Sequence, residues 1–153
     1  MRVEKDFEEL LKLFNQHGVK YCIIGAFAVA YHFKPRYTKD LDLFVEPSKE
    51  NAKKIMTAIK NFGFGSVGLS EEDFSREHQI IQLGVEPVRI DIITSIGSCS
   101  FEEAWKTRKA GTYGNEKVHF IGLGELIKSK KAANRPHDIA DIKNLEKVKK
   151  ASR

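Results

Sequence analysis

Residues 38–45 read Thr-Lys-Asp-Leu-Asp-Leu-Phe-Val, an apolar segment that carries two acidic residues near its start. The segment predicts a strand, and side chains two residues apart on a strand project from the same face, so Asp40 and Asp42 should point the same way. Burying a carboxylate in a sheet costs several kcal/mol unless a partner compensates its charge. This pair of aspartates therefore needs a partner.

A third acidic residue, Asp91, lies in a more apolar predicted strand, Val-Arg-Ile-Asp-Ile-Ile at residues 88–93. If this strand neighbours the first, three carboxylates converge and repel one another unless a divalent cation lies between them. We do not expect Arg89 to pair with Asp91, on the view that the two project from opposite faces of the strand. A plainer explanation of the first pair is that one aspartate faces solvent, or pairs with Arg36 or Arg89. A metal site is the leading hypothesis.

The remaining apolar patterns predict an α/β (α+β) fold, in which helices flank one mixed, twisted sheet and a pair of helices closes the chain. We find no repeat, linker or internal boundary, so residues 1–153 should form a single domain. The predicted strands cover residues 21–24, 40–45, 79–83, 88–94 and 118–121, with a hairpin across 84–87. The predicted helices run from residue 7 to a stop at Gly18 and over 26–32, 49–61, 101–108, 123–132 and 136–150, with a loop or single helical turn within 65–77 and a turn at 111–114.

The composition is that of a globular chain. Hydrophobic residues make up 41% of the 153 residues, which is enough for a sizeable core without a disulfide or a structural metal. No segment approaches the ~20 consecutive apolar residues that cross a bilayer, and the N-terminus lacks the apolar run of a signal peptide. We therefore expect a cytoplasmic protein that does not engage a membrane.

The net charge of +5 is concentrated towards the C-terminus. Residues 1–124 hold 17 basic and 17 acidic side chains, whereas residues 125–153 hold 9 basic and 4 acidic ones. A cationic helix beside an active site would favour an anionic partner. A solvated helix that ends in a lysine-rich tail explains the same charges equally well, so charge alone does not establish nucleic-acid binding.

A glycine stands where the first predicted strand gives way to a helix. Gly25, followed by Ala26, would let a ligand approach the backbone there, and the new helix offers unpaired N–H groups and a positive dipole end. Phosphate binding is one use of such a junction. Tight packing of a strand against a helix is at least as common a reason for the glycine.

The order of these motifs resembles the nucleotidyltransferase superfamily of the DNA polymerase β type: a strand ending in glycine, a helix, a strand with Asp-x-Asp, and a later strand with one more Asp. The sequence is more similar still to the small bacterial and archaeal minimal nucleotidyltransferases, including the AbiEii toxin-like group. Residues 36–42, Arg-Tyr-Thr-Lys-Asp-Leu-Asp, fit the Arg-x-Thr-x-Asp-hydrophobic-Asp element of those proteins, and residues 126–142 resemble their closing stretch. The resemblance covers about residues 8–146.

This resemblance implies a nucleotidyltransferase fold and transfer of a nucleoside monophosphate from an NTP to an acceptor hydroxyl, with two Mg²⁺ (or Mn²⁺) ions. The catalytic and metal-binding residues would be Asp40, Asp42 and Asp91, the last of which would help to activate the acceptor. Gly25 and Ala26 would cradle the triphosphate. The family has Ser or Gly at the second position, so Ala26 removes a hydroxyl contact to phosphate.

Four further residues are candidates for nucleotide binding: Arg36, Thr38, Lys130 and Arg135. The first two directly precede the aspartate pair and would contact phosphate or position that loop. The other two lie in the predicted C-terminal helices, where a solvated basic face is the alternative. For Asp138 and Asp141 we favour a structural role, because an acidic residue in the first turn complements the helix dipole.

The partners remain open at this level. The NTP is the expected substrate, and the acceptor is RNA, a protein side chain or a small molecule, with the basic tail favouring RNA. One alternative is a non-catalytic nucleotide-binding module of a toxin–antitoxin pair, which Ala26 and the small size support. A partner protein or a second copy of the chain would then complete the assembly. Another alternative is a structural domain whose aspartates are ordinary strand-end residues.

Overall fold

The computed structural model describes residues 3–63, 68–85 and 87–152 of the chain. Within these residues the strands form one six-stranded sheet in the order β3-β4-β2-β1-β6-β5. The elements in chain order are α1 (Lys5–Gln16), β1 (Tyr21–Ile24), α2 (Gly25–His32), β2 (Asp40–Val45), α3 (Lys49–Phe62), α4 (Glu71–Ser75), β3 (Ile80–Leu83), β4 (Arg89–Ile93), α5 (Phe101–Lys106), β5 (Lys109–Tyr113), β6 (Glu116–Phe120), α6 (Leu123–Ala133) and α7 (Pro136–Ala151).

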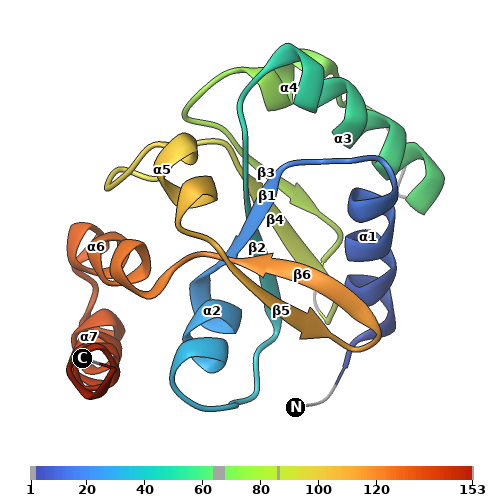
Figure 1. The fold of residues 1–153 in the computed structure, drawn as a ribbon. Coiled ribbons are helices and arrows are strands. Elements are labelled where there is room, and N and C mark those ends of the chain that lie inside the picture. Colours follow the sequence, from blue (N-terminus) through green and yellow to red (C-terminus); the bar gives the residue numbers. More distant parts are fainter. Residues whose placement is uncertain (1–2, 64–67, 86, 153) are drawn as a thin grey trace.

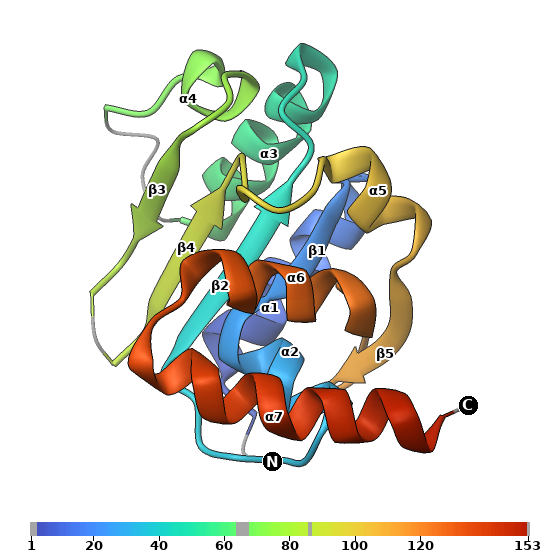
Figure 2. The same cartoon turned by 90° about the vertical axis from the view of Figure 1, so that its left-hand side faces the viewer.

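Helices cover both faces of the sheet. Helices α1 and α3 pack on one face, and α6 and α7 cross the other, where α2 also approaches them (Figures 1 and 2). The apolar periodicity of α1 explains its position, because its buried residues recur at the spacing of one helix face: Phe7, Leu10, Leu11 and Phe14. The predicted mixed sheet flanked by helices, with a C-terminal helical pair, is confirmed.

The pairing of the central strands positions the acidic residues. Strand β2 runs antiparallel to β1, with Ile24 opposite Asp42, and parallel to β4, with Asp42 opposite Asp91. The same register places Asp40 opposite Arg89. The strand of Asp91 is thus the direct neighbour of the strand that carries the first two aspartates.

The sequence missed one strand and overextended one helix. Residues 109–113 form β5, which pairs antiparallel with β6, where the sequence predicts only the connection after a helix ending at 108 and a turn at 111–114. This strand lies at the sheet edge and only Tyr113 in it is buried, so it lacks the apolar alternation that reveals a strand. Within 65–77 the sequence leaves open a loop or a single helical turn, and the structure has the short helix α4, while residues 64–67 lie outside the described part of the chain. The paired strands β3 and β4 match the expected hairpin, although residue 86 of its connection is not described.

Among the described residues, no helix combines the length and the apolar composition that crossing a membrane requires.

Candidate active site

Three aspartates meet where β2 lies beside β4. Asp42 and Asp91 are register partners, and Asp40 lies two residues before Asp42, on the same face. Asp91 is buried, while the other two are half-buried. Burial, together with the negative charges of Asp91 and Asp40, raises the pKa of the Asp42 carboxyl to about 7. The three side chains therefore form one electrostatically coupled cluster.

Arg89 pairs with Asp91, contrary to the expectation from the sequence. Its Nε donates to Asp91 Oδ1 at 3.2 Å and its Nη2 donates to Asp91 Oδ2 at 3.1 Å. The two residues are two positions apart, so they share a face of β4, and the view that they point to opposite faces is wrong. Arg89 and Lys130 also lower the pKa of Asp42, which reduces the effect of burial and of the two neighbouring aspartates. Arg89 is thus a site residue that the sequence reasoning missed, although the i, i+2 spacing could have revealed it.

The acidic cluster has the donor chemistry that a divalent cation prefers. Asp40 Oδ1 is buried and has no hydrogen-bond partner, and a buried acceptor without a partner is unusual in a folded protein. Carboxylate oxygens are hard ligands suited to Mg²⁺ or Mn²⁺, which would relieve the repulsion seen at Asp42. In the described part of the chain, no three His, Cys, Asp or Glu side chains are arranged as a finished metal-binding set. In this structure both oxygens of Asp91 accept hydrogen bonds from Arg89 rather than facing the other two aspartates as free ligands.

Gly25 lies against the Asp42 carboxylate. Its φ is +69°, and a Cβ at this position would lie 2.3 Å from Asp42 Oδ2, so both the backbone conformation and the space require glycine. Helix α2 begins at Gly25, and no side chain caps its first N–H groups. The glycine junction predicted from the sequence is therefore joined to the aspartate site, and the unpaired N–H groups of α2 start beside it.

The predicted nucleotide-binding cations gather on two aspartates of α7. Lys130 is 6% exposed, and its Nζ lies 3.1 Å from Asp138 Oδ1 and 3.2 Å from Asp141 Oδ2. Arg135 Nε lies 2.9 Å from Asp138 Oδ2, and Arg36 Nη1 lies 2.9 Å from Asp141 Oδ1. Helix α6, helix α7 and the segment before β2 are thus tied together by buried carboxylates.

Charge also links this cluster to the acidic site. Burial alone would raise the pKa of Asp138 and Asp141, but hydrogen bonds from Arg135, Lys130 and Arg36 hold both pKa values below their usual range. The hydrogen bond to Asp138 raises the pKa of Arg135 and burial lowers it, while the charge of Asp42 makes a smaller raising contribution. Asp138 occupies the N3 position of α7 and accepts a hydrogen bond from the Arg135 backbone N–H at 3.0 Å, which is a structural helix-capping role.

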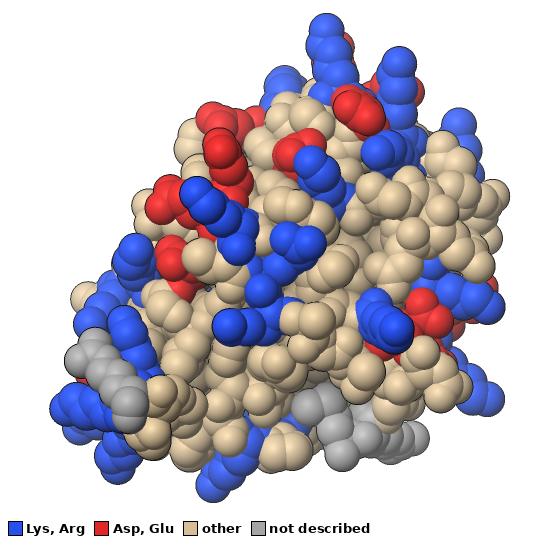
Figure 3. All heavy atoms as spheres, viewed as in Figure 1, with Lys and Arg blue, Asp and Glu red and all other residues tan. Residues whose placement is uncertain are grey.

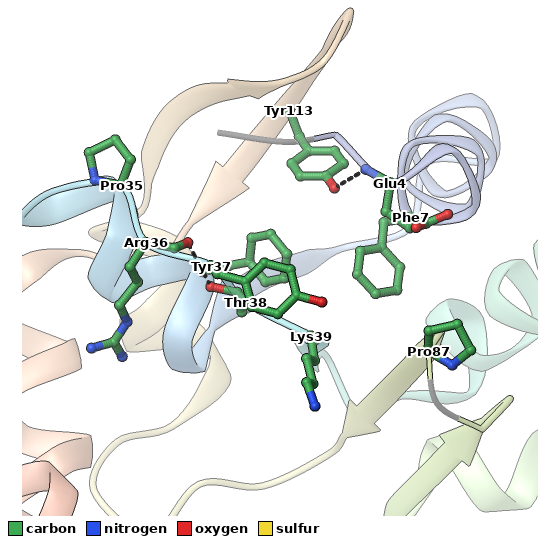
Figure 4. A pocket seen from close by; sticks show the side chains of 10 residues that line it. Glu4, Phe7, Pro35, Arg36, Tyr37, Thr38, Lys39, Pro87 and Tyr113 are labelled. Carbon is green, nitrogen blue, oxygen red and sulfur yellow. Dashed lines mark hydrogen bonds between the residues drawn. The ribbon is translucent and has the colours of Figure 1, made fainter.

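A cavity of about 480 Å³ is bordered by the segment that leads into β2, and none of the three aspartates is among its lining residues. Four aromatic rings and several polar side chains line it, among them Tyr37, Lys39 and Glu4. Figure 4 shows the Arg36 guanidinium directed away from these rings, whereas Tyr37 extends across the cavity. Thr38 Oγ1 donates to the Arg36 carbonyl at 3.3 Å, so it shapes this segment rather than standing free.

Solved proteins share this architecture at low sequence identity. A lincosamide antibiotic adenylyltransferase, LnuA, in a lincomycin-bound structure is 18% identical with a TM-score of 0.60, over 95% of this chain and 97% of that one. The antibiotic-resistance factor ANT(2'')-Ia is 10% identical with a TM-score of 0.61, over 97% of this chain and 83% of that one. An antigenic nucleotidyltransferase-like protein from Paracoccidioides brasiliensis is 12% identical with a TM-score of 0.54, over 94% of this chain and 76% of that one. At such identities the likeness establishes the nucleotidyltransferase fold.

The family assignment comes from the sequence as a whole. Comparison with curated proteins gave no match. A family model described as "nucleotidyl transferase of unknown function (DUF2204)" matches residues 3–153, which is nearly the entire chain. The protein therefore belongs to this nucleotidyl transferase family.

Proposed function

We propose that this protein is a metal-dependent nucleotidyltransferase that moves a nucleoside monophosphate from an NTP to an acceptor hydroxyl and releases pyrophosphate. Its membership of a nucleotidyl transferase family supports the reaction class. The observation that carries the proposal is the position of Asp42. It is the register partner of Asp91 on the adjacent parallel strand, and it lies against Gly25 at the start of a helix. Carboxylates for a cation and backbone N–H groups for phosphate thus adjoin one another.

The metal would be held by Asp40, Asp42 and Asp91. Two Mg²⁺ or Mn²⁺ ions bound there would lower the pKa of the acceptor hydroxyl and stabilise charge on the leaving pyrophosphate. Asp40 Oδ1 is buried without a hydrogen-bond partner, and the pKa of Asp42 is raised. Both observations support carboxylates whose negative charge a bound cation would neutralise. Asp91 would orient the acceptor hydroxyl from the neighbouring strand once its oxygens are free.

The triphosphate would lie at the beginning of α2. Gly25 allows close approach to the backbone, and with Ala26 at the next position the contacts would come from N–H groups rather than from a hydroxyl. Arg36 and Arg135 keep 41% and 58% of their side chains exposed, which leaves guanidinium N–H groups for phosphate oxygens. Lys130, buried between its two aspartates, would act on the nucleotide through its charge and by holding these arginines in place.

For the acceptor, a small molecule gains support from the cavity beside the segment that precedes β2. Its volume of about 480 Å³ falls within the range of about 300–1,000 Å³ that small-molecule sites occupy. Two proteins of this fold also bear on small acceptors: LnuA is described as a lincosamide antibiotic adenylyltransferase, and ANT(2'')-Ia was solved in complex with adenylyl-2''-tobramycin. We therefore place a hydroxylated small molecule first, with ATP as the first NTP to test.

RNA and protein acceptors come second. Exposed lysines gather along α7, at the lower left of Figure 3, and would attract a polyanion.

The narrower AbiEii toxin-like assignment remains a prediction, as does the cytoplasmic location. A non-catalytic nucleotide-binding half of a toxin–antitoxin pair is the alternative function, and Ala26 is the observation in its favour.

Label transfer tests the reaction. The protein is incubated with Mg²⁺ or Mn²⁺, a mixture of hydroxylated small molecules, RNA or proteins, and ATP labelled at either the α- or the γ-phosphate. We expect the α-label alone to reach an acceptor, and an Asp40→Asn, Asp42→Asn double variant to lose the transfer. Glu50→Gln, on an exposed side chain of α3, is the control variant that should retain it. Transfer that persists in the double variant contradicts the site, while NTP binding without any transfer favours the non-catalytic module.

A further inference from the structure

Arg89 is the one cation that bonds directly to the acidic cluster among the residues that the structure describes. It takes both oxygens of Asp91, at 3.2 and 3.1 Å, and the β2–β4 register places it opposite Asp40. Its side chain is 38% exposed, whereas that of Asp91 is 12% exposed. A partly exposed guanidinium therefore covers a buried carboxylate at the centre of the proposed site.

The bond to Arg89 opposes the binding of a cation by Asp91. The two oxygens that would face a divalent cation are the same two that accept the guanidinium N–H groups. A guanidinium carries no lone pair for a metal and is repelled by it, so the arrival of a cation favours movement of the guanidinium away from Asp91. The flexible side chain and its exposure make this movement a rotation of one residue rather than a change of fold.

A displaced Arg89 would remain beside the phosphates. Its backbone is fixed on β4, opposite Asp40, so the guanidinium stays within one side-chain length of the site. A planar fork of N–H donors pairs bidentately with phosphate oxygens, which are the groups that an NTP brings. We infer that Arg89 is a switch residue: it neutralises Asp91 while no cation is bound, and it turns to the phosphates of the nucleotide when a divalent cation takes Asp91.

This inference rests on the proposed function and makes a prediction that a purely structural ion pair does not. If Arg89 only stabilised Asp91, its removal would weaken the fold and leave the site less able to bind metal. If it competes with the metal, its removal should strengthen binding of the cation alone. It should at the same time weaken binding of the nucleotide, because a phosphate contact is lost.

Binding of Mn²⁺ to the full chain, followed by electron paramagnetic resonance, separates the two. We expect Arg89→Met to bind Mn²⁺ without nucleotide about tenfold more tightly than the wild type, because a repelling charge is removed, and to bind a non-hydrolysable ATP analogue at saturating Mn²⁺ about tenfold more weakly. Arg89→Lys should fall between them, since a lysine keeps the charge but not the fork. Lys54→Met is the matched control, because Lys54 is 39% exposed and pairs with Glu50 on α3, and both affinities should be unchanged.

The wild-type protein supplies a second readout that does not depend on a variant folding. The Arg89 Nε–H signal in a ¹H–¹⁵N spectrum, assigned by its absence in Arg89→Lys, should shift when Mg²⁺ and the analogue bind. Unchanged Mn²⁺ and nucleotide affinities in Arg89→Met, or an unchanged Nε–H signal in the liganded wild type, overturn the inference. If the wild type binds no Mn²⁺ even with the analogue, the proposed function itself fails, which is a distinguishable result.

Discussion

Gly25 and Asp42 are in such close contact that the glycine cannot be replaced without moving the aspartate. A Cβ on Gly25 would lie 2.3 Å from Asp42 Oδ2 and 3.2 Å from its Cγ. Gly25 begins α2 and Asp42 lies on β2, so one contact joins the glycine motif to the acidic motif. The fold thereby sets the backbone N–H groups of a helix start beside the carboxylate that the proposed reaction needs.

Replacing this glycine should separate a backbone effect from a site effect. Gly25→Ala and Gly63→Ala both place a methyl group at a positive φ, +69° and +89°, and each should lose about 1–3 kcal/mol of stability. Only Gly25→Ala also displaces Asp42, since nothing lies within 4 Å of a Cβ on Gly63. We expect Gly63→Ala to keep nucleotidyl transfer and Gly25→Ala to lose it, measured alongside urea unfolding. Full activity in a folded Gly25→Ala protein would show that this contact does not matter.

The buried ion cluster between α6 and α7 predicts a large effect of one lysine on stability. Lys130→Met leaves Asp138 and Asp141 without their shared buried cation. We expect a loss of about 3 kcal/mol, the lower end for breaking a buried pair, because Arg135 and Arg36 still bond to the two aspartates. The measurement is the free energy of unfolding in urea.

Lys131→Met is the control for this change. Lys131 pairs with Glu146 at 2.8 Å, but the two side chains are 58% and 44% exposed, so the pair should contribute little. Equal losses in the two variants would mean that the buried cluster does not hold the helices together.

The raised pKa of Asp42 predicts how stability changes with pH. With a pKa of about 7 in the folded protein against 3.8 for the free group, the native state holds a proton that the unfolded state releases. This contribution is fully present below about pH 4 and is lost as the pH rises to about 7. Asp42→Asn has no such proton, so the stability of the wild type relative to the variant should fall between pH 4 and 7.

The difference between wild type and variant is the quantity to measure, because other groups titrate in the same window. Burial lowers the pKa of His32 and His119, and these histidines make the protein less stable as the pH falls below about 6.5. Their effect is common to both proteins and cancels. A pH-independent difference would mean that Asp42 ionises normally and does not feel its two neighbours.

Much of the site could be predicted from short-range patterns. The two-residue period of a strand puts Asp40 and Asp42 on one face. The apolar residues around Asp91 indicate that its carboxylate must have a partner that compensates its charge. The same period, correctly applied, also predicts that Arg89 shares the face of Asp91. Residues at positions i and i+2 of a strand lie on the same face, so the sequence itself carries the signal for this ion pair.

Long-range pairing could not be predicted in this way. Lys130 is eleven residues from Asp141, and Arg36 is 105 residues from it, so no local pattern indicates that the three meet. Strand β5 escaped detection because a mostly exposed edge strand needs few apolar residues. The closeness of Gly25 to Asp42 depends on the antiparallel register of β1 and β2, which places Ile24 opposite Asp42 and which the sequence does not state.

The most direct test of the central claim is where a cation binds. Crystals grown with Mn²⁺ and a non-hydrolysable NTP analogue would locate the metal by its anomalous scattering. We predict a peak bounded by carboxylate oxygens of Asp40, Asp42 and Asp91, with the analogue's phosphates at the start of α2. A peak elsewhere, or bound analogue with no metal at these aspartates, would contradict the account.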